Sequence, residues 1–155
     1  MIEFMILGAP RSGTAWAATW LSSDRVHCIH DPLARWPKER LWEIESTKTL
    51  GVSCTALGLW PAFCNQQTAR KVVLHRDPTE IQVSMARLGI DGRYDFESLD
   101  QIQGLHCHWR DLFEHPQRIT DYLHLPFDRE RHEELVRMNI QDTEVIRSIK
   151  ARRVA

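Results

Sequence analysis

The feature of this sequence that most restricts its fold is an apolar run that ends in a glycine-bounded loop and leads into a helix-compatible segment. Residues 4–7 are apolar, Gly8 and Gly13 enclose the loop, and residues 15–21 can continue as a helix. Proteins use this order of strand, loop and helix to cradle a phosphate, because glycines let backbone N–H groups turn inward and a helix N-terminus is partly positive. The sequence therefore predicts a phosphate-binding loop after the first strand.

The loop differs from a standard nucleotide-triphosphate loop at one position. Gly8 and Gly13 fit the spacing G-x-x-x-x-G, but Thr14 stands where a lysine would reach the β- and γ-phosphates. Arg11 is the one cation within the loop sequence. These residues favour a short anionic group over a triphosphate bound with magnesium.

Strand-like and helix-like segments alternate along the rest of the chain. We expect strands over residues 3–7, 26–29, 50–54, 71–75 and 105–109, with helices over 15–21, over 57–67 with a break near Pro61, and after residues 77, 115 and 126. Residues 33–47 are expected to form a loop with a short helix, and the basic tail from residue 143 a helix. This alternation predicts an α/β fold of three layers around a mainly parallel sheet.

Three loops of the predicted sheet are expected to share one edge. In parallel sheets, ligands bind outside the carboxyl ends of the strands. The loop at 8–14, the turn at 30–32 and the corner at 76–78 each follow a predicted strand. We therefore expect all three to open onto the same edge.

Composition limits the class of protein. The 155 residues suit one domain spanning 1–155, and the net charge of −1 argues against a dedicated nucleic-acid binder. The apolar runs are too short to span a bilayer, and the first residues lack the basic region of a secretory signal, so we expect no membrane partner. The four cysteines have no C-x-x-C spacing and are expected to be reduced thiols of a cytoplasmic protein, three of them in apolar stretches.

Two segments together resemble one protein family. Residues 8–16 (GAPRSGTAW) resemble the 5′-phosphosulfate loop of sulfotransferases, and residues 73–84, from VLHRDP to Ser84, resemble their 3′-phosphate-binding segment. Weaker similarity continues through residues 109–112 (WRDL), where the family often has Tyr-Glu-Asp-Leu, and residues 123–128 (LHLPFD). The resemblance covers roughly residues 3–138 and implies a P-loop NTPase-like, sulfotransferase topology.

What the resemblance implies is transfer of a sulfuryl group from 3′-phosphoadenosine 5′-phosphosulfate (PAPS) to an acceptor hydroxyl or amine, without a metal. Arg11 would neutralise charge on the bridging oxygen, Arg76 and Ser84 would hold the 3′-phosphate, and the amides of residues 11–14 with the Thr14 hydroxyl would hold the 5′-phosphate. Trp16 would either stack on the adenine or lie in the core. The implied cofactor-binding residues are Gly8, Pro10, Arg11, Ser12, Gly13, Thr14, Ala15, Trp16, Arg76 and Ser84.

A base must take the proton of the acceptor. The carbohydrate-modifying branch of the family often has a Glu-Pro pair after the second strand, and here the matching pair is Asp31-Pro32. His30 beside it has the better intrinsic pKa. Both residues are candidates, with a slight preference for Asp31.

Departures from the family pattern leave alternatives open. Ala15 replaces a second threonine, the late G-x-x-G-x-x-K segment is missing, and the chain is shorter than typical members. The protein could be a compact enzyme for a small-molecule or carbohydrate acceptor, one completed by a partner subunit or as a homo-oligomer, or a catalytically degenerate nucleotide-binding module. A small kinase-like phosphotransferase on the same scaffold is a further alternative.

Other residue patterns have a simpler structural interpretation. The pairs His27 with His30 and His106 with His108 invite a metal site, but no carboxylate or cysteine is placed to complete one. His132 lacks the second histidine of a zinc-protease helix. Three further tryptophans could line an acceptor pocket, although packing is the favoured interpretation: Trp36, Trp42 and Trp60.

Overall fold

The sheet at the centre of the molecule has five parallel strands. The computed structural model describes residues 1–138, and the predicted tail helix lies outside them. The strands are β1 (Ile2–Gly8), β2 (Val26–His30), β3 (Thr49–Cys54), β4 (Arg70–His75) and β5 (Leu105–His108). They lie in the order β2-β3-β1-β4-β5, and every pairing is parallel. The predicted parallel α/β sheet is confirmed.

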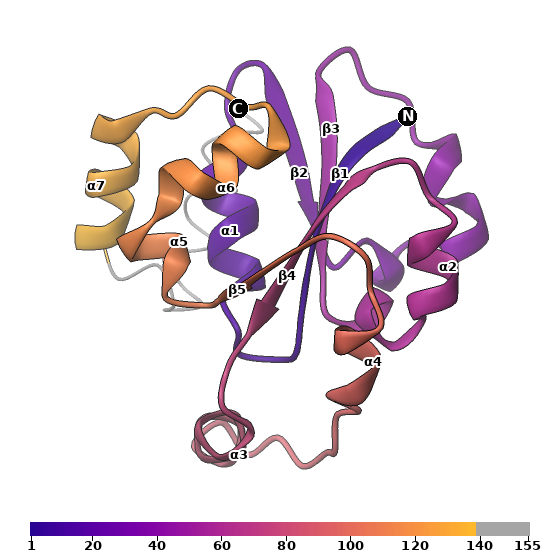
Figure 1. The fold of residues 1–155 in the computed structure, drawn as a ribbon, viewed down its shortest axis with the longest axis vertical. Coiled ribbons are helices and arrows are strands. Elements are labelled where there is room, and N and C mark those ends of the chain that lie inside the picture. The colour runs from indigo at the N-terminus through magenta and orange to yellow at the C-terminus, as the bar shows by residue number, and fades with distance from the viewer. Residues whose placement is uncertain (139–155) are drawn as a thin grey trace.

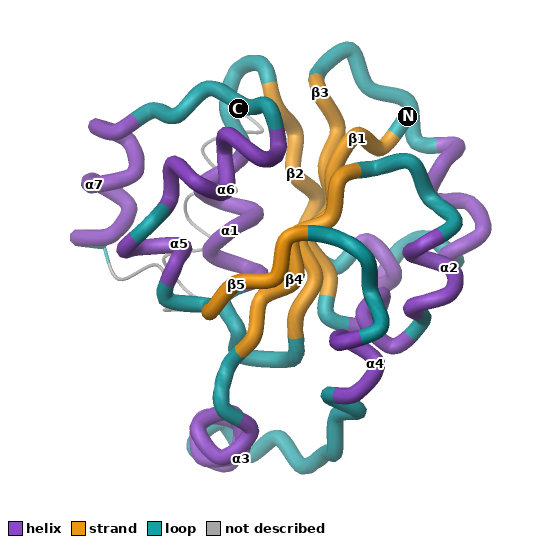
Figure 2. The backbone as a smooth tube through the Cα atoms, in the orientation of Figure 1, coloured by secondary structure: helices purple, strands orange, loops and turns teal. Residues whose placement is uncertain are grey.

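Helices cover both faces of this sheet. The α-helices are α1 (Thr14–Leu21), α2 (Pro61–Asn65), α3 (Pro78–Ala86), α4 (Glu97–Asp100), α5 (Asp111–Glu114), α6 (Pro116–Leu123) and α7 (Arg129–Arg137). The 3-10 segments are η1 (Pro32–Ala34), η2 (Lys38–Glu43) and η3 (Ala56–Leu59). Figure 1 shows α1, α5, α6 and α7 on one face, α2 and α4 on the other, and α3 beyond one end of the sheet. Figure 2 shows the strands between these layers, as predicted.

The differences from the sequence prediction concern short elements. The short helix expected within 33–47 is the 3-10 helix η2, and the break near Pro61 divides η3 from α2. The one-turn helices α4 and α5 have no counterpart in the prediction. Four-residue helices carry too few apolar positions to show a helical period, so the sequence pattern does not indicate them.

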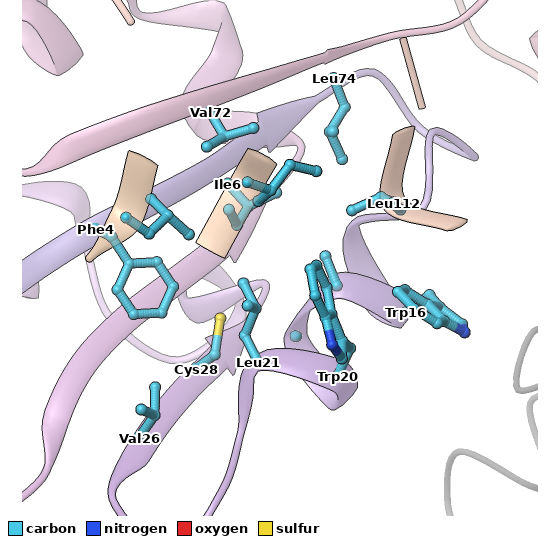
Figure 3. Close-up of a cluster of buried hydrophobic side chains, with 14 of the residues drawn as sticks. Phe4, Ile6, Trp16, Trp20, Leu21, Val26, Cys28, Val72, Leu74 and Leu112 are labelled. Carbon is cyan, nitrogen blue, oxygen red and sulfur yellow. The ribbon is translucent and has the colours of Figure 1, made fainter. Parts of the chain in front are cut away.

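The side chains of β1 divide the core in two. Phe4 and Ile6 belong to the cluster under α1, whereas Met5 and Leu7 belong to the cluster on the opposite face. All four are fully buried, as expected for the central strand of a parallel sheet covered on both sides. The first cluster also contains Trp16, Trp20 and Leu112 and is drawn in Figure 3.

Helix α1 is buried almost all round. Seven of its eight residues are buried, with Ala15 alone half-exposed. It packs on the sheet, and Phe113 of α5 and His132 of α7 pack against its Trp16. Because both sides of the helix are covered, its apolar sequence has no solvent-facing stripe.

The four cysteines are buried and unpaired. Burial raises the pKa of Cys54 and of Cys64 to about 11, and that of Cys107 to about 12. Burial also raises the pKa of Cys28. Unpaired thiols in the interior agree with the sequence prediction. Within residues 1–138, no helix combines the length and the apolar character needed to cross a membrane.

Candidate functional site

The predicted phosphate loop at 8–14 and the predicted corner at 76–78 follow adjacent strands. β1 lies between β3 and β4, and the chain visits the β3 side first and the β4 side afterwards. The strand order therefore reverses beside β1, which is where open α/β sheets bind ligands. The turn at 30–32 ends β2, two strands away from β1. All three predicted loops lie at the carboxyl edge, as expected.

The phosphate loop (residues 8–14) owes its shape to two left-handed residues. Arg11 has a φ of 66° and Gly13 a φ of 88°. A Cβ atom on Gly13 would lie 2.7 Å from Cδ1 of Leu112, so both the backbone and the available space require glycine there. At the start of the loop, a Cβ on Gly8 would lie 3.1 Å from the carbonyl oxygen of Leu74.

The helix after the loop has no side-chain cap. Gly13 is the N-cap of α1 and provides no side chain, whereas Asp77 caps α3 and Asp128 caps α7 with their carboxylates. The first N–H groups of a helix have no partner within the helix and carry its partial positive charge. The N-terminus of α1 is therefore suited to an anion.

The two hydroxyl residues of the loop, Ser12 and Thr14, are buried. Ser12 is fully buried and its Oγ has no hydrogen-bond partner, while its N–H donates to the carbonyl of Ala9 at 3.2 Å. Thr14 is 5% exposed, and its carbonyl accepts a hydrogen bond from Oγ of Ser53 at 2.7 Å. Ser12 thus offers a ligand no exposed hydroxyl, and Pro10 and Ala15 in and after the loop are half-buried.

Arg11 joins the two predicted phosphate-binding segments directly. Its Nε donates a hydrogen bond to Oγ of Ser84, at 3.0 Å. The family resemblance assigns Arg11 to the 5′-phosphosulfate and Ser84 to the 3′-phosphate. Residues 73 positions apart in the chain therefore meet above the sheet edge.

Arg76 lies against the same loop. Its Nη1 donates to the carbonyl of Arg11 at 2.6 Å, and its Nε donates to Oε2 of Glu80 at 3.0 Å. The pattern Asp77-Pro78-Thr79-Glu80 predicts a capping box for α3. Asp77 does cap the helix, accepting from the N–H groups of Thr79 and Glu80, but the Glu80 carboxylate pairs with Arg76.

Two residues beside Arg76 were not predicted as site residues. The Arg76 guanidinium lies 4.4 Å from the ring centroid of Trp109, and the guanidinium of Arg110 lies 5.8 Å from it. Nη2 of Arg110 is 3.9 Å from Oε1 of Glu80. We call Arg76, Glu80, Trp109 and Arg110 the arginine corner. The family pattern has an acidic residue at the position of Arg110, so the resemblance did not indicate it.

The two candidate bases form a pair at the end of β2. Nε2 of His30 is 3.3 Å from Oδ2 of Asp31, and Oδ1 of Asp31 accepts a hydrogen bond from the N–H of Thr55 at 3.3 Å. The N–H of Asp31 donates to the carbonyl of Ser53 at 2.8 Å. Because Ser53 also bonds Thr14, one buried serine connects this pair to the phosphate loop.

Trp16 lies in the core. It is 3% exposed and packs against the rings of Trp20, Phe113 and His132, at centroid distances of 5.5, 4.7 and 5.5 Å. Figure 3 shows Trp16 and Trp20 next to each other on α1. The sequence allows two roles for Trp16, and packing in the core is the one that the structure shows.

Several of the remaining tryptophans and histidines have packing or polar partners. Trp42 packs against Phe63, and Trp60 is half-exposed beneath the ammonium of Lys38. Among residues 1–138, no three or more His, Cys, Asp or Glu side chains are grouped to hold a metal. His75 and His106 stack and share a hydrogen bond of 2.8 Å between Nε2 and Nδ1. Burial, and then His106, lower the pKa of His75.

Comparison with solved structures identifies the fold. The chain superposes on mouse sulfotransferase SULT7A1 complexed with PAP with a TM-score of 0.59 and 12% identity, over 88% of this chain and 63% of that one. It superposes on the sulfotransferase domain from the curacin biosynthetic pathway with a TM-score of 0.57 and 13% identity, over 84% and 77%. No family model and no curated protein sequence matches the chain. The protein thus has a sulfotransferase-like fold, and it spans less than two thirds of the SULT7A1 chain.

Proposed function

We propose that this protein transfers a sulfuryl group from PAPS to an acceptor hydroxyl or amine. The observation that supports this most directly is the contact between the two anion-binding segments, with Nη1 of Arg76 2.6 Å from the carbonyl oxygen of Arg11. PAPS carries a phosphosulfate and a separate 3′-phosphate, so a protein that binds it needs two neighbouring anion sites. The phosphate loop and the arginine corner provide them on adjacent strands.

The phosphate loop suits the 5′-phosphosulfate. The uncapped N-terminus of α1 provides N–H donors and partial positive charge, and the left-handed Arg11 and Gly13 shape the backbone around the anion. The Arg11 guanidinium, bonded to Ser84, belongs to the loop itself. When the sulfuryl group leaves, this cation would stabilise the charge that develops on the phosphate oxygen.

The arginine corner suits the 3′-phosphate. Arg76 has a side chain that is 16% exposed, and a guanidinium in that position can donate two parallel hydrogen bonds to a phosphate. Ser84 on α3 and Arg76 both contact Arg11, Ser84 through the Arg11 side chain and Arg76 through its carbonyl. The two residues that the resemblance assigns to one phosphate therefore share a neighbour.

Asp31 and His30 would receive the acceptor proton. In the transfer, the bond from sulfur to the phosphate oxygen breaks, a bond from sulfur to the acceptor forms, and the acceptor gives up its proton. The pair is two strands from β1, which at the usual strand spacing is roughly 10 Å. If His30 takes the proton, Asp31 at 3.3 Å stabilises the imidazolium; if Asp31 takes it, the carboxyl group becomes neutral and His30 only orients it.

A nucleotide-binding module without transferase activity is the second candidate. The bond between Arg11 and Ser84 favours it, because it engages the cation that the transfer would use. A kinase-like phosphotransferase has weaker support, since Thr14 stands where the triphosphate lysine would be.

A binding titration with adenosine 3′,5′-bisphosphate tests the shared part of both candidates. We expect binding by calorimetry and a ligand-dependent rise in melting temperature, since the native state alone would bind the nucleotide. ATP with magnesium serves as the comparison ligand. Tighter binding of ATP than of the bisphosphate would favour the phosphotransferase and remove the proposal.

An activity screen separates the transferase from the binding module. PAPS is supplied with a panel of phenols, alcohols, amines and sugars, and sulfated products are detected by mass spectrometry. For an acceptor that reacts, Asp31→Asn and His30→Gln are each expected to lower kcat by about 100-fold, the usual share of a general base. Exposed Glu45→Gln is the control. Bisphosphate binding without any sulfated product would support the binding module.

The cytoplasmic location and the homo-oligomer remain predictions from the sequence.

A further inference from the structure

The Glu80 carboxylate lies between two guanidinium groups, one on each oxygen. Oε2 accepts from Nε of Arg76 at 3.0 Å, and Oε1 faces Nη2 of Arg110 at 3.9 Å. Arg76 belongs to the turn after β4, whereas Arg110 follows β5. Two adjacent strand ends thus direct a cation each at one small anion.

Trp109 holds both cations on one ring. The guanidinium carbons of Arg76 and Arg110 lie 4.4 and 5.8 Å from its centroid, within the range of cation–π attraction. The ring is fixed from the side by an edge contact with Phe113 at 5.7 Å and by a backbone bond from Trp109 N to the carbonyl of His75 at 2.8 Å. The positions of the two guanidiniums are therefore set by a rigid surface as well as by Glu80.

The charges at this corner are not balanced. Arg76 and Arg110 both face the Glu80 carboxylate, so two positive charges meet one negative charge there. A phosphate carries more charge than a carboxylate and three acceptor oxygens, so it would satisfy two guanidiniums better than Glu80 does. The Glu80 side chain is 42% exposed and can turn to solvent at small cost.

We propose that Arg110 is a second phosphate-binding arginine, which clamps the nucleotide 3′-phosphate together with Arg76, and that Glu80 is an internal carboxylate stand-in that the phosphate displaces. This proposal rests on the proposed function and specifies how the site distinguishes nucleotides. Recognition of the 3′-phosphate then depends on Arg110, a residue absent from the family pattern. The clamp provides a cation at the corner of a chain that lacks the family's late lysine segment.

Two ligands and two substitutions test the clamp by calorimetry. The ligands are adenosine 3′,5′-bisphosphate and adenosine 5′-monophosphate, which lacks the 3′-phosphate. Arg110→Ala is expected to weaken bisphosphate binding by about tenfold and monophosphate binding by less than about twofold. Glu80→Gln is expected to tighten bisphosphate binding by about threefold, because the competing carboxylate is gone.

Matched controls come from α6 and α7, outside the arginine corner. Arg118→Ala removes an arginine of equal side-chain exposure, 56% against 55%, with a carboxylate contact of 3.8 Å. Glu133→Gln removes a carboxylate from another i, i+4 arginine pair. Both are expected to leave the two affinities within about twofold of wild type, since their charges are exposed and screened.

Three outcomes would overturn the proposal. If Arg110→Ala leaves bisphosphate binding unchanged, or weakens both ligands equally, Arg110 does not contact the 3′-phosphate, although the proposed function stands. If Glu80→Gln weakens bisphosphate binding, Glu80 positions Arg76 and is no stand-in. If the wild type does not bind the bisphosphate, the clamp and the proposed function both fail.

Discussion

The phosphate loop and the arginine corner are neighbours that hold their shapes in opposite ways. The loop is shaped by backbone conformation and close packing, with Gly8 against Leu74 and Gly13 against Leu112. The corner is shaped by exposed or half-buried side chains that pair through charge. The comparison teaches that the loop is a property of the fold, whereas the corner can be tuned by single substitutions without loss of stability.

The largest expected effect is at Gly13. Gly13→Ala places a methyl group 2.7 Å from Leu112 Cδ1 at a φ of 88° and should cost about 3 kcal/mol of unfolding free energy, together with nucleotide binding. Gly89→Ala is the matched control, because Gly89 has a φ of 65° with no atom within 4 Å of the added Cβ. That substitution should cost only about 1 kcal/mol. Urea unfolding measures both, and equal costs would show that packing does not shape the loop.

Arg76→Ala should affect binding and leave the fold intact. Loss of a charge-assisted contact to a phosphate should weaken bisphosphate binding by about 30-fold, or about 2 kcal/mol. Unfolding free energy should change by less than about 1 kcal/mol, because the ion pair with Glu80 is partly exposed. Arg87→Ala, at the exposed end of α3, is the control and should change neither quantity. A large loss of stability in Arg76→Ala would show that the fold depends on the arginine corner as it does on the loop.

His75 should make the free energy of unfolding depend on pH. The pKa of His75 is lowered from its ordinary value of 6.5 by burial and by His106, with a small contribution from His108, while Asp100 opposes the shift. As pH falls below 6.5, the unfolded chain therefore binds more protons than the folded one, and stability decreases. Above that pH the group is neutral in both states and has no effect.

Substitution at this histidine checks the assignment. His75→Gln should reduce the loss of unfolding free energy between about pH 7.5 and about pH 5.5. Exposed His115→Gln is the control and should keep the pH dependence of the wild type. An unchanged dependence in His75→Gln would mean that other groups, such as His27, whose pKa burial also lowers, are responsible.

The smallest expected effect is at Ser12. Its buried Oγ has no partner, so Ser12→Ala should leave stability unchanged or raise it by up to about 1 kcal/mol. Ser53→Ala removes an equally buried hydroxyl that does donate to Thr14 and should cost about 1 kcal/mol. Because the contacts proposed for the loop are made by its backbone, Ser12→Ala should also keep bisphosphate affinity. A tenfold loss, on the order of 1.4 kcal/mol, would show that the hydroxyl turns toward the ligand.

The sequence predicted what depends on short stretches of chain. The strand, loop and helix around Gly8 and Gly13, and the strand that ends at Arg76, are local patterns, and the alternation of such units was sufficient for the parallel sheet. The buried position of Trp16 depends on how α5, α6 and α7 pack over α1. The second partner of Glu80, Arg110, depends on which strand end lies beside α3, so the local pattern did not indicate it.

Because all four cysteines are buried, the surface of this protein offers no native thiol for labelling. With every native thiol in the interior and its pKa raised, few thiolates are present at neutral pH to react with an alkylating dye. A cysteine introduced in place of Val83, which is 48% exposed and precedes Ser84, would therefore take up a fluorophore selectively. Its emission would follow the arrival and departure of a nucleotide at α3 in real time, with all four natural cysteines still in place.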